Sequence, residues 1–276
     1  MTLELVKKSK HISILGCGWL GLPLAIDRIA KGDTIKGSTT TESKIEKLKT
    51  EGITPYLFTL GESLEKEYLD FLSGSEIIII NFPPKRIPNI IEIYQNQIKS
   101  ILPFISDTQK IIFISSTSVY QNTNGKVTET LNIEPEKESG KAVAAVERLL
   151  QEQFENRVSI IRLSGLIGDD RLPGRFLANK KEVQNGDVPI NVIHREDCIG
   201  LINAVIEKEA WGEIINGCAD QHPIRKEYYT LAAQKIGLTP PTFIKQEKQA
   251  YKIISNTKSK TLLGYSYIHP DPLKLI

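Results

Sequence analysis

A glycine-rich turn near the N-terminus constrains the fold more than any other feature of the sequence. Gly16, Gly18 and Gly21 form the pattern G-x-G-x-x-G directly after the apolar run His11–Leu15. A helical pattern follows the turn and leads to a second strand-like segment, Thr34–Gly37. In such a unit the first glycine allows the turn, the second lets the backbone approach a pyrophosphate, and the third lets the helix pack on the sheet. The order of these segments predicts a dinucleotide-binding fold.

The same turn supplies the first candidates for a cofactor site. The start of a helix presents free N–H groups and the positive end of its dipole, which favours an anion such as a pyrophosphate. A single motif of this kind also fits a glycine turn in another α/β protein, so the legible strands and helix around it are what favour a nucleotide site. We assign the whole turn to the cofactor: Gly16, Cys17, Gly18, Trp19, Leu20 and Gly21.

Apolar runs and helical patterns alternate along the first two-thirds of the chain. The run Glu76–Asn81 (EIIIIN) is unbroken, which is typical of a parallel strand buried on both faces. The other predicted strands are Ile53–Leu60, Lys110–Ser115 and Val158–Leu163, and segments with helical spacing lie between them. This alternation predicts an α/β protein of the Rossmann type, with a doubly wound parallel sheet and right-handed crossovers.

The pattern is looser in the last third of the chain. Gly165–Pro189 is rich in Gly, Asp, Lys and Pro, and is predicted to form loops away from the sheet. Asp197 is predicted to cap a late helix, and Lys226–Ile236 is predicted to form another helix. Glu213–Asn216 is predicted to be one more strand.

These patterns suggest two functional parts. Residues 1–165, together with about 191–218, are predicted to form an NAD(P)-binding Rossmann domain. Residues 166–190 and 219–276 are predicted to form a small C-terminal lobe that binds a small-molecule substrate.

The composition argues against two classes of partner. The net charge is only +2 and no Lys/Arg cluster is interleaved with aromatic residues, so nucleic acid is not expected. No stretch reaches the roughly 18 apolar residues of a transmembrane helix, so no membrane is expected. Cys17, Cys198 and Cys218 lack the spacing of a metal or disulfide site, which predicts no metal and a cytoplasmic protein. Lys7, Lys8 and Lys10 are predicted to lie in a solvated N-terminal tail.

The residues after the second predicted strand bear on the choice of cofactor. An acidic residue there binds the ribose 2′-hydroxyl of NAD, whereas its absence beside a cation admits the 2′-phosphate of NADP. We predict NADP, with NAD as the alternative, held by Ser38, Thr39, Thr40 and Lys44. Glu42 would oppose this choice if its carboxylate pointed inward. The same residues also fit the N-cap of a helix with no ligand.

The segment Lys110–Gln121 (KIIFISSTSVYQ) resembles the extended short-chain dehydrogenase/reductase family, the NAD-dependent epimerase/dehydratase group. Members carry a strand that ends in Ser-Ser-x-x-Val-Tyr-Gly, and the match continues until Gln121 replaces the glycine. Ser159–Gly168, Asn191–Asp197 and Gly212–Asn216 resemble later segments of the family in the same order. The resemblance covers essentially the whole chain and is strongest to atypical members that open with G-x-G-x-x-G.

The resemblance implies further site residues. It places the hydroxyl of Ser116 on a substrate carbonyl or alcohol. It places Ser115 in the cofactor site, and it makes Phe82, Pro83 and Pro84 a wall beside the cofactor's ribose.

Two further features bear on what the protein binds, namely the cations after the predicted strand Glu76–Asn81 and two helices that could form a dimer. Lys85 and Arg86 could reach a phosphate or a carboxylate, although a solvated loop fits the same residues. Family members are often dimers through two helices, which would begin here near Ile90 and Lys141.

The catalytic Tyr-x-x-x-Lys pair of the family is not matched. Family members read Tyr-Gly-x-Ser-Lys-x-x-x-Glu, and alignment on Gly140 and Glu147 puts Ser139 in the tyrosine position and Val143 in the lysine position. In the family the tyrosine transfers a proton as hydride moves, and the lysine lowers its pKa. Because serine is not ionised near neutral pH and valine cannot polarise it, the standard chemistry of the family is not supported.

Two side chains are candidates for a substitute proton donor. Tyr120 follows the serine segment, although the corresponding tyrosine of the family is ordinarily structural. His194 is a usable acid or base, and Arg195 beside it could bind an anionic substrate. The alternative is that His194 and Asp197 only fix the start of the late helix. With Ser116, these two residues complete the candidate catalytic set.

Two functional hypotheses remain after this comparison. We favour an NADP(H)-dependent oxidoreductase or epimerase that acts on a small polar, sugar-like substrate with a non-standard proton donor. The alternative is a non-catalytic NADP(H)-binding sensor or regulatory protein, which the pair Ser139 and Val143 favours. A β-hydroxyacid dehydrogenase would require a long all-helical C-terminal half, whereas strands and loops are predicted here.

Overall fold

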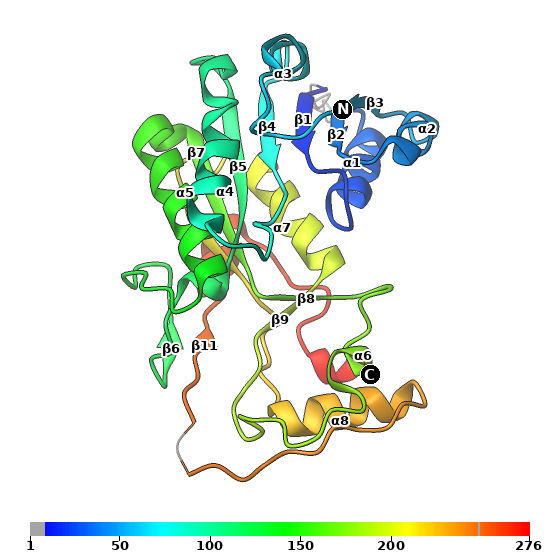
Figure 1. The fold of residues 1–276 in the computed structure, drawn as a ribbon, viewed down its shortest axis with the longest axis vertical. Helices are drawn as coiled ribbons and strands as arrows, with labels where there is room; N and C mark the ends of the chain where they lie inside the picture. The colour runs from blue at the N-terminus through cyan, green and yellow to red at the C-terminus, as the bar shows by residue number, and fades with distance from the viewer. Residues whose placement is uncertain (1–8, 248) are drawn as a thin grey trace, which may run out of the picture. The chain divides into compact units, whose positions relative to one another are not determined.

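The computed structural model describes residues 9–247 and 249–276, so Lys7 and Lys8 lie outside the described residues. The chain divides into two compact units, of which the first contains residues 1–114 and 145–158 and the second contains 115–144 and 159–276. In the described part of the chain, the main sheet has seven strands in the order β10-β7-β5-β4-β1-β2-β3. This parallel sheet with flanking helices confirms the predicted Rossmann-type fold (Figure 1).

The first unit contains one edge of the main sheet and the helices that connect its strands. Its strands are β1 (His11–Leu15), β2 (Thr34–Thr39), β3 (Thr54–Leu57), β4 (Ile77–Ile80) and most of β5 (Lys110–Ser116). Its helices are α1 (Gly21–Ala30), α2 (Ile45–Thr50), α3 (Glu65–Leu72), α4 (Ile90–Lys99) and the C-terminal part of α5 (Glu138–Phe154). The strand predicted over Ile53–Leu60 is therefore shorter than the apolar pattern suggested.

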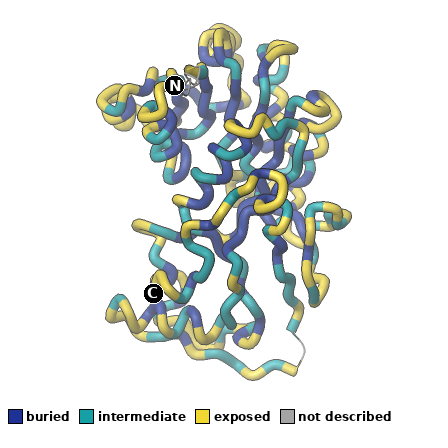
Figure 2. The backbone as a smooth tube through the Cα atoms, turned by 180° about the vertical axis from the view of Figure 1, so that it is seen from behind, coloured by how far each residue is buried: buried dark blue, intermediate teal, exposed yellow. Residues whose placement is uncertain are grey.

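The core of the first unit lies along β1 and β4. Strand β1 pairs in parallel with β2 on one side and with β4 on the other, and Ile14 is the partner of Ile79. All four isoleucines of β4 are buried, as expected for a strand covered on both faces. Figure 2 shows buried residues concentrated along the strands, while exposed residues gather on the turns.

A buried ion pair joins the end of α1 to the start of β2. The guanidinium of Arg28 contacts the carboxylate of Asp33, and both side chains are almost completely buried. The other oxygen of Asp33 accepts a hydrogen bond of 2.9 Å from the backbone N–H of Lys10. These bonds fix the connection between α1 and β2 and hold it against the residue that precedes β1.

The second unit combines the rest of the main sheet with short elements. Its strands are β6 (Lys126–Val127), β7 (Val158–Leu163), β8 (Gly165–Ile167), β9 (Val192–His194), β10 (Ile214–Gly217) and β11 (Ile253–Ile254). Its helices are α6 (Gly174–Leu177), α7 (Arg195–Glu207), α8 (Arg225–Lys235) and α9 (Thr257–Leu263). Strands β6 and β11 form one two-stranded sheet, and β8 and β9 form another.

The prediction for the segment Gly165–Pro189 was wrong in part. Gly165–Pro189 is not only loops, since it contains β8, which pairs with β9, and the short helix α6. Helix α6 lies so close to α8 that a Cβ on Gly174 would come within 2.2 Å of the carbonyl oxygen of Ala232. These elements are too short to show a clear periodicity in the sequence.

The cap of α7 also differs from the prediction. The helix begins at Arg195, and its N-cap is His194, whose Nδ1 accepts a hydrogen bond of 3.3 Å from the N–H of Glu196. Asp197 lies inside the helix and is fully buried. Its carboxylate accepts hydrogen bonds from the Tyr265 hydroxyl and from the backbone N–H groups of Ile268 and His269. Asp197 therefore ties a later segment of the chain to α7.

None of the helices in the described part of the chain combines the length and the apolar character that crossing a membrane requires. The division into an NAD(P)-binding domain and a substrate-binding lobe, with boundaries at residues 165, 190 and 218, stays a prediction.

Candidate functional site

The glycine turn between β1 and α1 is held by bonds to β2 and to the end of β4. Gly16 has a φ of +97°, and its N–H donates to the hydroxyl of Ser38 over 3.0 Å. The side-chain amide of Asn81 donates to the carbonyl oxygen of Gly16 over 3.1 Å. Since the carboxyl ends of parallel strands meet at one edge of the sheet, Asn81 reaches the turn from the strand beside it.

The three glycines of the motif face different surroundings. A Cβ on Gly16 would lie 2.6 Å from the carbonyl oxygen of Asn81, and one on Gly21 would lie 2.2 Å from the carbonyl oxygen of Gly16. Both positions are closed by the protein's own backbone. A Cβ on Gly18 would meet nothing within 4 Å. The open space at Gly18 is what a close approach of a ligand to the backbone requires.

A cavity of about 400 Å³ opens beside this turn, entirely within the first unit. The structure brings together here many of the residues predicted to bind the cofactor: Gly16, Cys17, Gly18, Ser38, Thr39, Thr40, Lys44, Phe82 and Pro83. Trp19, Leu20, Gly21 and Pro84 are not part of its lining. Thr41, Thr59, Asn81, Lys85 and Gln97 add further polar groups to the wall.

The end of β2 gives the cavity hydroxyl groups and a cation. The hydroxyl oxygen of Ser38 accepts from Gly16, and that of Thr39 accepts from the N–H of Thr41 over 3.1 Å, so both hydroxyl hydrogens stay available to donate. Lys44 and Lys85 both line the cavity. Among the described lining residues there is no carboxylate, and Glu42 is not one of them.

Two other lining residues have well-defined surroundings. The ring of Phe82 packs edge-on against Tyr94 with 5.3 Å between centroids, and the Tyr94 hydroxyl donates to the Phe82 carbonyl over 2.7 Å. Burial raises the pKa of the Cys17 thiol to about 12, although nearby Lys44 acts in the opposite direction. Cys17 therefore contributes a neutral wall, and its thiol is not a nucleophile near neutral pH.

The two serines from the family-like segment end strand β5. Ser116 is half-buried, and its hydroxyl oxygen accepts a hydrogen bond of 3.1 Å from the N–H of Ser118. Its hydroxyl hydrogen can still be donated to another group. Ser115 is buried and takes part in further interactions within the molecule. The roles of both residues stay predictions.

Tyr120 lies in a buried polar network of the second unit. Its hydroxyl donates to the Asn216 side-chain oxygen over 2.9 Å and accepts from Arg162 over 2.7 Å. The Lys252 ammonium donates to the Tyr120 carbonyl oxygen. Burial raises the pKa of Tyr120, and Arg162 opposes this shift. Its role as an acid stays a prediction, and these surroundings favour the structural alternative.

His194 lies at the junction of β9 and α7, close to a second histidine. Its ring centroid is 4.0 Å from that of His269, whose Nε2 is 2.5 Å from a carboxylate oxygen of Glu196. Burial, and then the neighbouring His269, lower the pKa of His194. Arg195 forms an ion pair with Asp169. His194 takes the cap position that was predicted for Asp197, which agrees with the alternative that it fixes the start of the helix, while its role as an acid or base stays a prediction.

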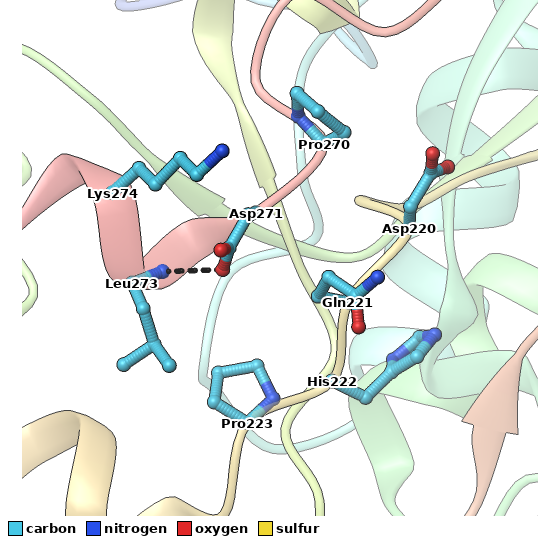
Figure 3. Close-up of a pocket in the computed structure, with 8 residues that line it drawn as sticks. All are labelled: Asp220, Gln221, His222, Pro223, Pro270, Asp271, Leu273 and Lys274. Atoms are coloured by element: carbon cyan, nitrogen blue, oxygen red, sulfur yellow. Dashed lines mark hydrogen bonds between the residues drawn. The ribbon is translucent and has the colours of Figure 1, made fainter.

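A second cavity, of about 480 Å³, lies in the part of the chain predicted to form the substrate lobe. Figure 3 shows its lining, which comes from residues 220–223 and from the C-terminal segment around Asp271. Lys274 and Asp220 lie on opposite sides of it, and Asp271 accepts a 3.0 Å hydrogen bond from the N–H of Leu273 (Figure 3). Asp220 is also paired with Lys260 over 2.6 Å. The lining could hold a small polar molecule.

Comparison with known proteins places this geometry in a family. Protein YeeZ from Escherichia coli strain K12 is 35% identical over 269 residues, which cover 96% of this chain and 98% of YeeZ. The chain belongs to the YeeZ family. No family model matches the sequence.

Solved structures place this YeeZ-family chain in a fold family. The dTDP-glucose 4,6-dehydratase from Bacillus anthracis, solved with NAD, has a TM-score of 0.78 at 16% identity, over 97% of this chain and 95% of that chain. The UDP-glucuronic acid 4-epimerase from Bacillus cereus, solved with UDP-glucuronic acid and NAD, has a TM-score of 0.75 at 19% identity, over 96% of each chain. The fold is that of the extended short-chain dehydrogenase/reductase family, which confirms the resemblance.

In this YeeZ-family chain, two positions correspond to the catalytic tyrosine and lysine of the short-chain dehydrogenase/reductase family. Both positions lie on α5. Ser139 is half-buried near the start of the helix, and Val143 is 5% exposed. Sequence reasoning missed Asn81 and Gln97 in the cavity wall. Asn81 could have been found, because it follows β4 at the edge where β1 ends, whereas Gln97 lies within a helix and carries no local signal.

Proposed function

We propose that this protein binds NADP(H) in the cavity beside Gly18 and is an oxidoreductase or epimerase. The observation that carries the proposal is the composition of that cavity. It joins an open backbone position in a glycine turn to hydroxyl groups and two lysines, without a carboxylate in the described lining.

The residues present fit a dinucleotide. The pyrophosphate would lie against the turn at Gly16–Gly18, next to the start of α1. Phe82 and Pro83 would form the apolar wall beside a ribose. When bound, NADP(H) supplies or accepts a hydride. The protein's own contribution is to orient the dinucleotide and to hold the substrate hydroxyl or carbonyl, for which Ser116 has a donor hydrogen left.

The charges in the cavity favour NADP over NAD. NAD sites typically place a carboxylate on the ribose 2′-hydroxyl at the end of the second strand, and this would repel a 2′-phosphate. Here the corresponding edge offers Ser38, Thr39 and Lys44, and Lys85 adds a second cation to the same cavity. Hydrogen bonds in which one partner is charged are among the stronger ones in proteins.

A small polar substrate fits the second cavity of this chain. Its carboxylates, imidazole and ammonium group can each bind hydroxyl groups, which sugars present in number. The two solved structures described above are enzymes named for nucleotide sugars. A cytoplasmic setting, in keeping with three free thiols, and a homodimer through α4 and α5 belong to the same proposal.

A non-catalytic NADP(H)-binding sensor is the second candidate. Ser139 and Val143 favour it, since neither side chain can supply the proton or lower a neighbouring pKa. The network around Tyr120 favours it too, because that hydroxyl already has a donor and an acceptor inside the protein. Ser116 and the polar second cavity favour an enzyme.

A fluorescence titration with NADPH and NADH tests the cofactor proposal. Trp19 lies in the turn, and a Trp211→Phe variant removes the other indole, so that quenching reports on the turn alone. We expect micromolar binding of NADPH and much weaker binding of NADH. Absence of binding by both nucleotides would overturn the enzyme and the sensor together.

A substrate screen then separates the enzyme from the sensor. NADPH oxidation or NADP reduction in the presence of sugar-like carbonyls or alcohols, lost in Ser116→Ala, would support the enzyme. Nucleotide binding without turnover on any of them would support the sensor.

A further inference from the structure

Three ligating side chains of the second unit meet at the start of α7. His194 ends β9, Glu196 lies in the first turn of α7, and His269 comes from the segment after α9. One ligand atom from each lies within 4.8 Å of the others. We propose that these three residues form a binding site for a divalent transition-metal ion of the Zn²⁺ class. Two imidazoles and one carboxylate are a donor set that such ions accept.

The distances need only a small adjustment to suit an ion. Nδ1 of His194 is 3.6 Å from the Glu196 carboxylate oxygen, and Nε2 of His269 is 2.5 Å from the same oxygen. Ligands about 2.0–2.1 Å from a tetrahedral ion lie roughly 3.3 Å from one another. The first separation is close to this value. The second would lengthen through a rotation of the Glu196 side chain, which is 58% exposed and free to move.

The ring of His194 and the backbone of His269 are both held in place. A Cβ on Gly168 would come within 2.5 Å of Nε2 of His194, so that nitrogen faces the backbone and Nδ1 is left as the ligand. The backbone N–H of His269 donates to buried Asp197 over 3.0 Å. The ion would replace two existing contacts, namely the 3.3 Å cap bond from the Glu196 N–H to His194 and the hydrogen bond between His269 and Glu196.

The surrounding charges favour a cation. Among the described residues, the carboxylate of Glu196 pairs with the two histidines, and the charge of Arg195 also acts on it without forming an ion pair. Arg195, the nearest cation in sequence, is paired with Asp169. Buried Asp197 adds a further carboxylate beneath the cluster. Three protein ligands leave a coordination position open, which would be reachable from solvent on the side of the exposed Glu196.

The sequence predicts no metal here because the ligands are far apart. His194 and Glu196 are separated by one residue, but His269 follows Glu196 by 73 positions. Common metal motifs place their ligands in closer pairs. The hydrogen bonds between Asp197 and the segment 265–269 bring the second histidine to the start of α7.

Calorimetric titration of the tag-free, chelator-treated full chain with Zn²⁺ tests the proposal. We expect one ion per chain with a dissociation constant in the micromolar range or below. Substitution of Co²⁺ should give the visible absorption of a low-coordinate site with imidazole ligands. Glu196→Gln should weaken Zn²⁺ binding by at least about tenfold, since even changes outside the ligand shell lower affinity by that factor.

Two variants complete the design. His269→Gln should weaken binding as Glu196→Gln does, whereas His11→Gln, which alters an exposed histidine of the first unit, should leave it unchanged. If His269→Gln loses its native circular dichroism, the exposed Glu196→Gln alone decides. No saturable binding, or equal affinity in Glu196→Gln and the unmodified protein, would overturn the site and leave a hydrogen-bonded cluster that ties the C-terminal segment to α7.

Discussion

The two units use their polar side chains in opposite ways. In the first unit, the hydroxyl groups of Ser38 and Thr39 and the ammonium of Lys44 line an open cavity, and their hydrogens remain available. In the second unit, Tyr120 and Asn216 are buried and bonded to each other and to their neighbours. Groups of the first kind can exchange water for a ligand, whereas groups of the second kind stabilise the fold.

This difference separates binding from chemistry. The dinucleotide motif has kept both its structural glycines and its open one. The catalytic motif of the family has kept a serine and the adjoining Val-Tyr pair, but Tyr120 serves the interior and the tyrosine and lysine positions hold Ser139 and Val143. Binding of the nucleotide is therefore better supported than the family's standard proton transfer.

The largest expected effect is a difference in stability between substitutions at Gly21, which is closed by backbone atoms, and at Gly18, which is open. Gly21→Ala should lower the free energy of unfolding by about 3 kcal/mol, because its Cβ would lie 2.2 Å from a backbone oxygen. Gly18→Ala should change stability by less than about 0.5 kcal/mol, since its Cβ meets nothing within 4 Å. Urea denaturation of both variants measures the difference.

Gly18→Ala should instead weaken NADPH binding by about tenfold or more, because the methyl group occupies the approach to the pyrophosphate. Unchanged NADPH affinity in this folded variant would contradict the placement of the cofactor.

Tyr120→Phe tests the second half of the comparison. Loss of the hydroxyl leaves Asn216 without its donor and removes one acceptor from Arg162 in a buried site. The free energy of unfolding should fall by roughly 1–3 kcal/mol. Tyr251→Phe is the matched control, because the Tyr251 hydroxyl makes no hydrogen bond within the described part of the chain. This variant should change stability by less than about 0.5 kcal/mol. A stable Tyr120→Phe protein that loses turnover would instead support Tyr120 as the acid.

The parts of the fold with strong local patterns could be predicted from the sequence. The glycine turn and the isoleucine run of β4 correspond to real elements because glycine spacing and apolar runs reflect backbone geometry directly. The pairings of β8 with β9 and of β6 with β11 could not be predicted, since two or three residues carry no period. The cap of α7 was misassigned because histidine took the position that aspartate usually occupies.

Site residues that lie close together in the sequence could be predicted, whereas groups assembled from distant parts of the chain could not. Ser38 and Thr39 end β2, and Thr40 and Lys44 come soon after it. Their common cavity agrees with the position of β2 beside the glycine turn. The network of Tyr120 joins residues 42 and 96 positions away, and Glu196 and His269 in the second unit are 73 positions apart. Contacts of this range depend on tertiary packing and leave no trace in the local pattern of the chain.

Lys44→Ala sharpens the choice of cofactor. Loss of a charged hydrogen-bond donor facing a phosphate should weaken NADPH binding by about tenfold, or roughly 1.4 kcal/mol, and should leave NADH binding almost unchanged. Lys47→Ala, one turn away and outside the cavity lining, is the control for the change in net charge. Equal losses for NADPH and NADH would mean that Lys44 does not contact the 2′-phosphate. Lys85→Ala in the same assay shows whether the second lysine shares this role.

The smallest expected effect is the pH dependence of stability that comes from one buried thiol in each unit, Cys17 and Cys218. Burial raises the pKa of Cys17 and of Cys218 to about 12, from an ordinary value of 9.0. The folded protein therefore keeps protons that the unfolded chain releases, so the stability contributed by each thiol is complete below pH 9 and is lost as the pH rises toward 12. Between pH 8 and pH 10 each thiol should lower the free energy of unfolding by about 1 kcal/mol. Cys17→Ser and Cys218→Ser should each reduce this alkaline loss by a similar amount in urea denaturation at the two pH values. A full alkaline loss in Cys17→Ser would show that Cys17, although it lines the cavity, titrates as a solvent-exposed thiol, and the first unit would then be more open at the glycine turn than its packing indicates.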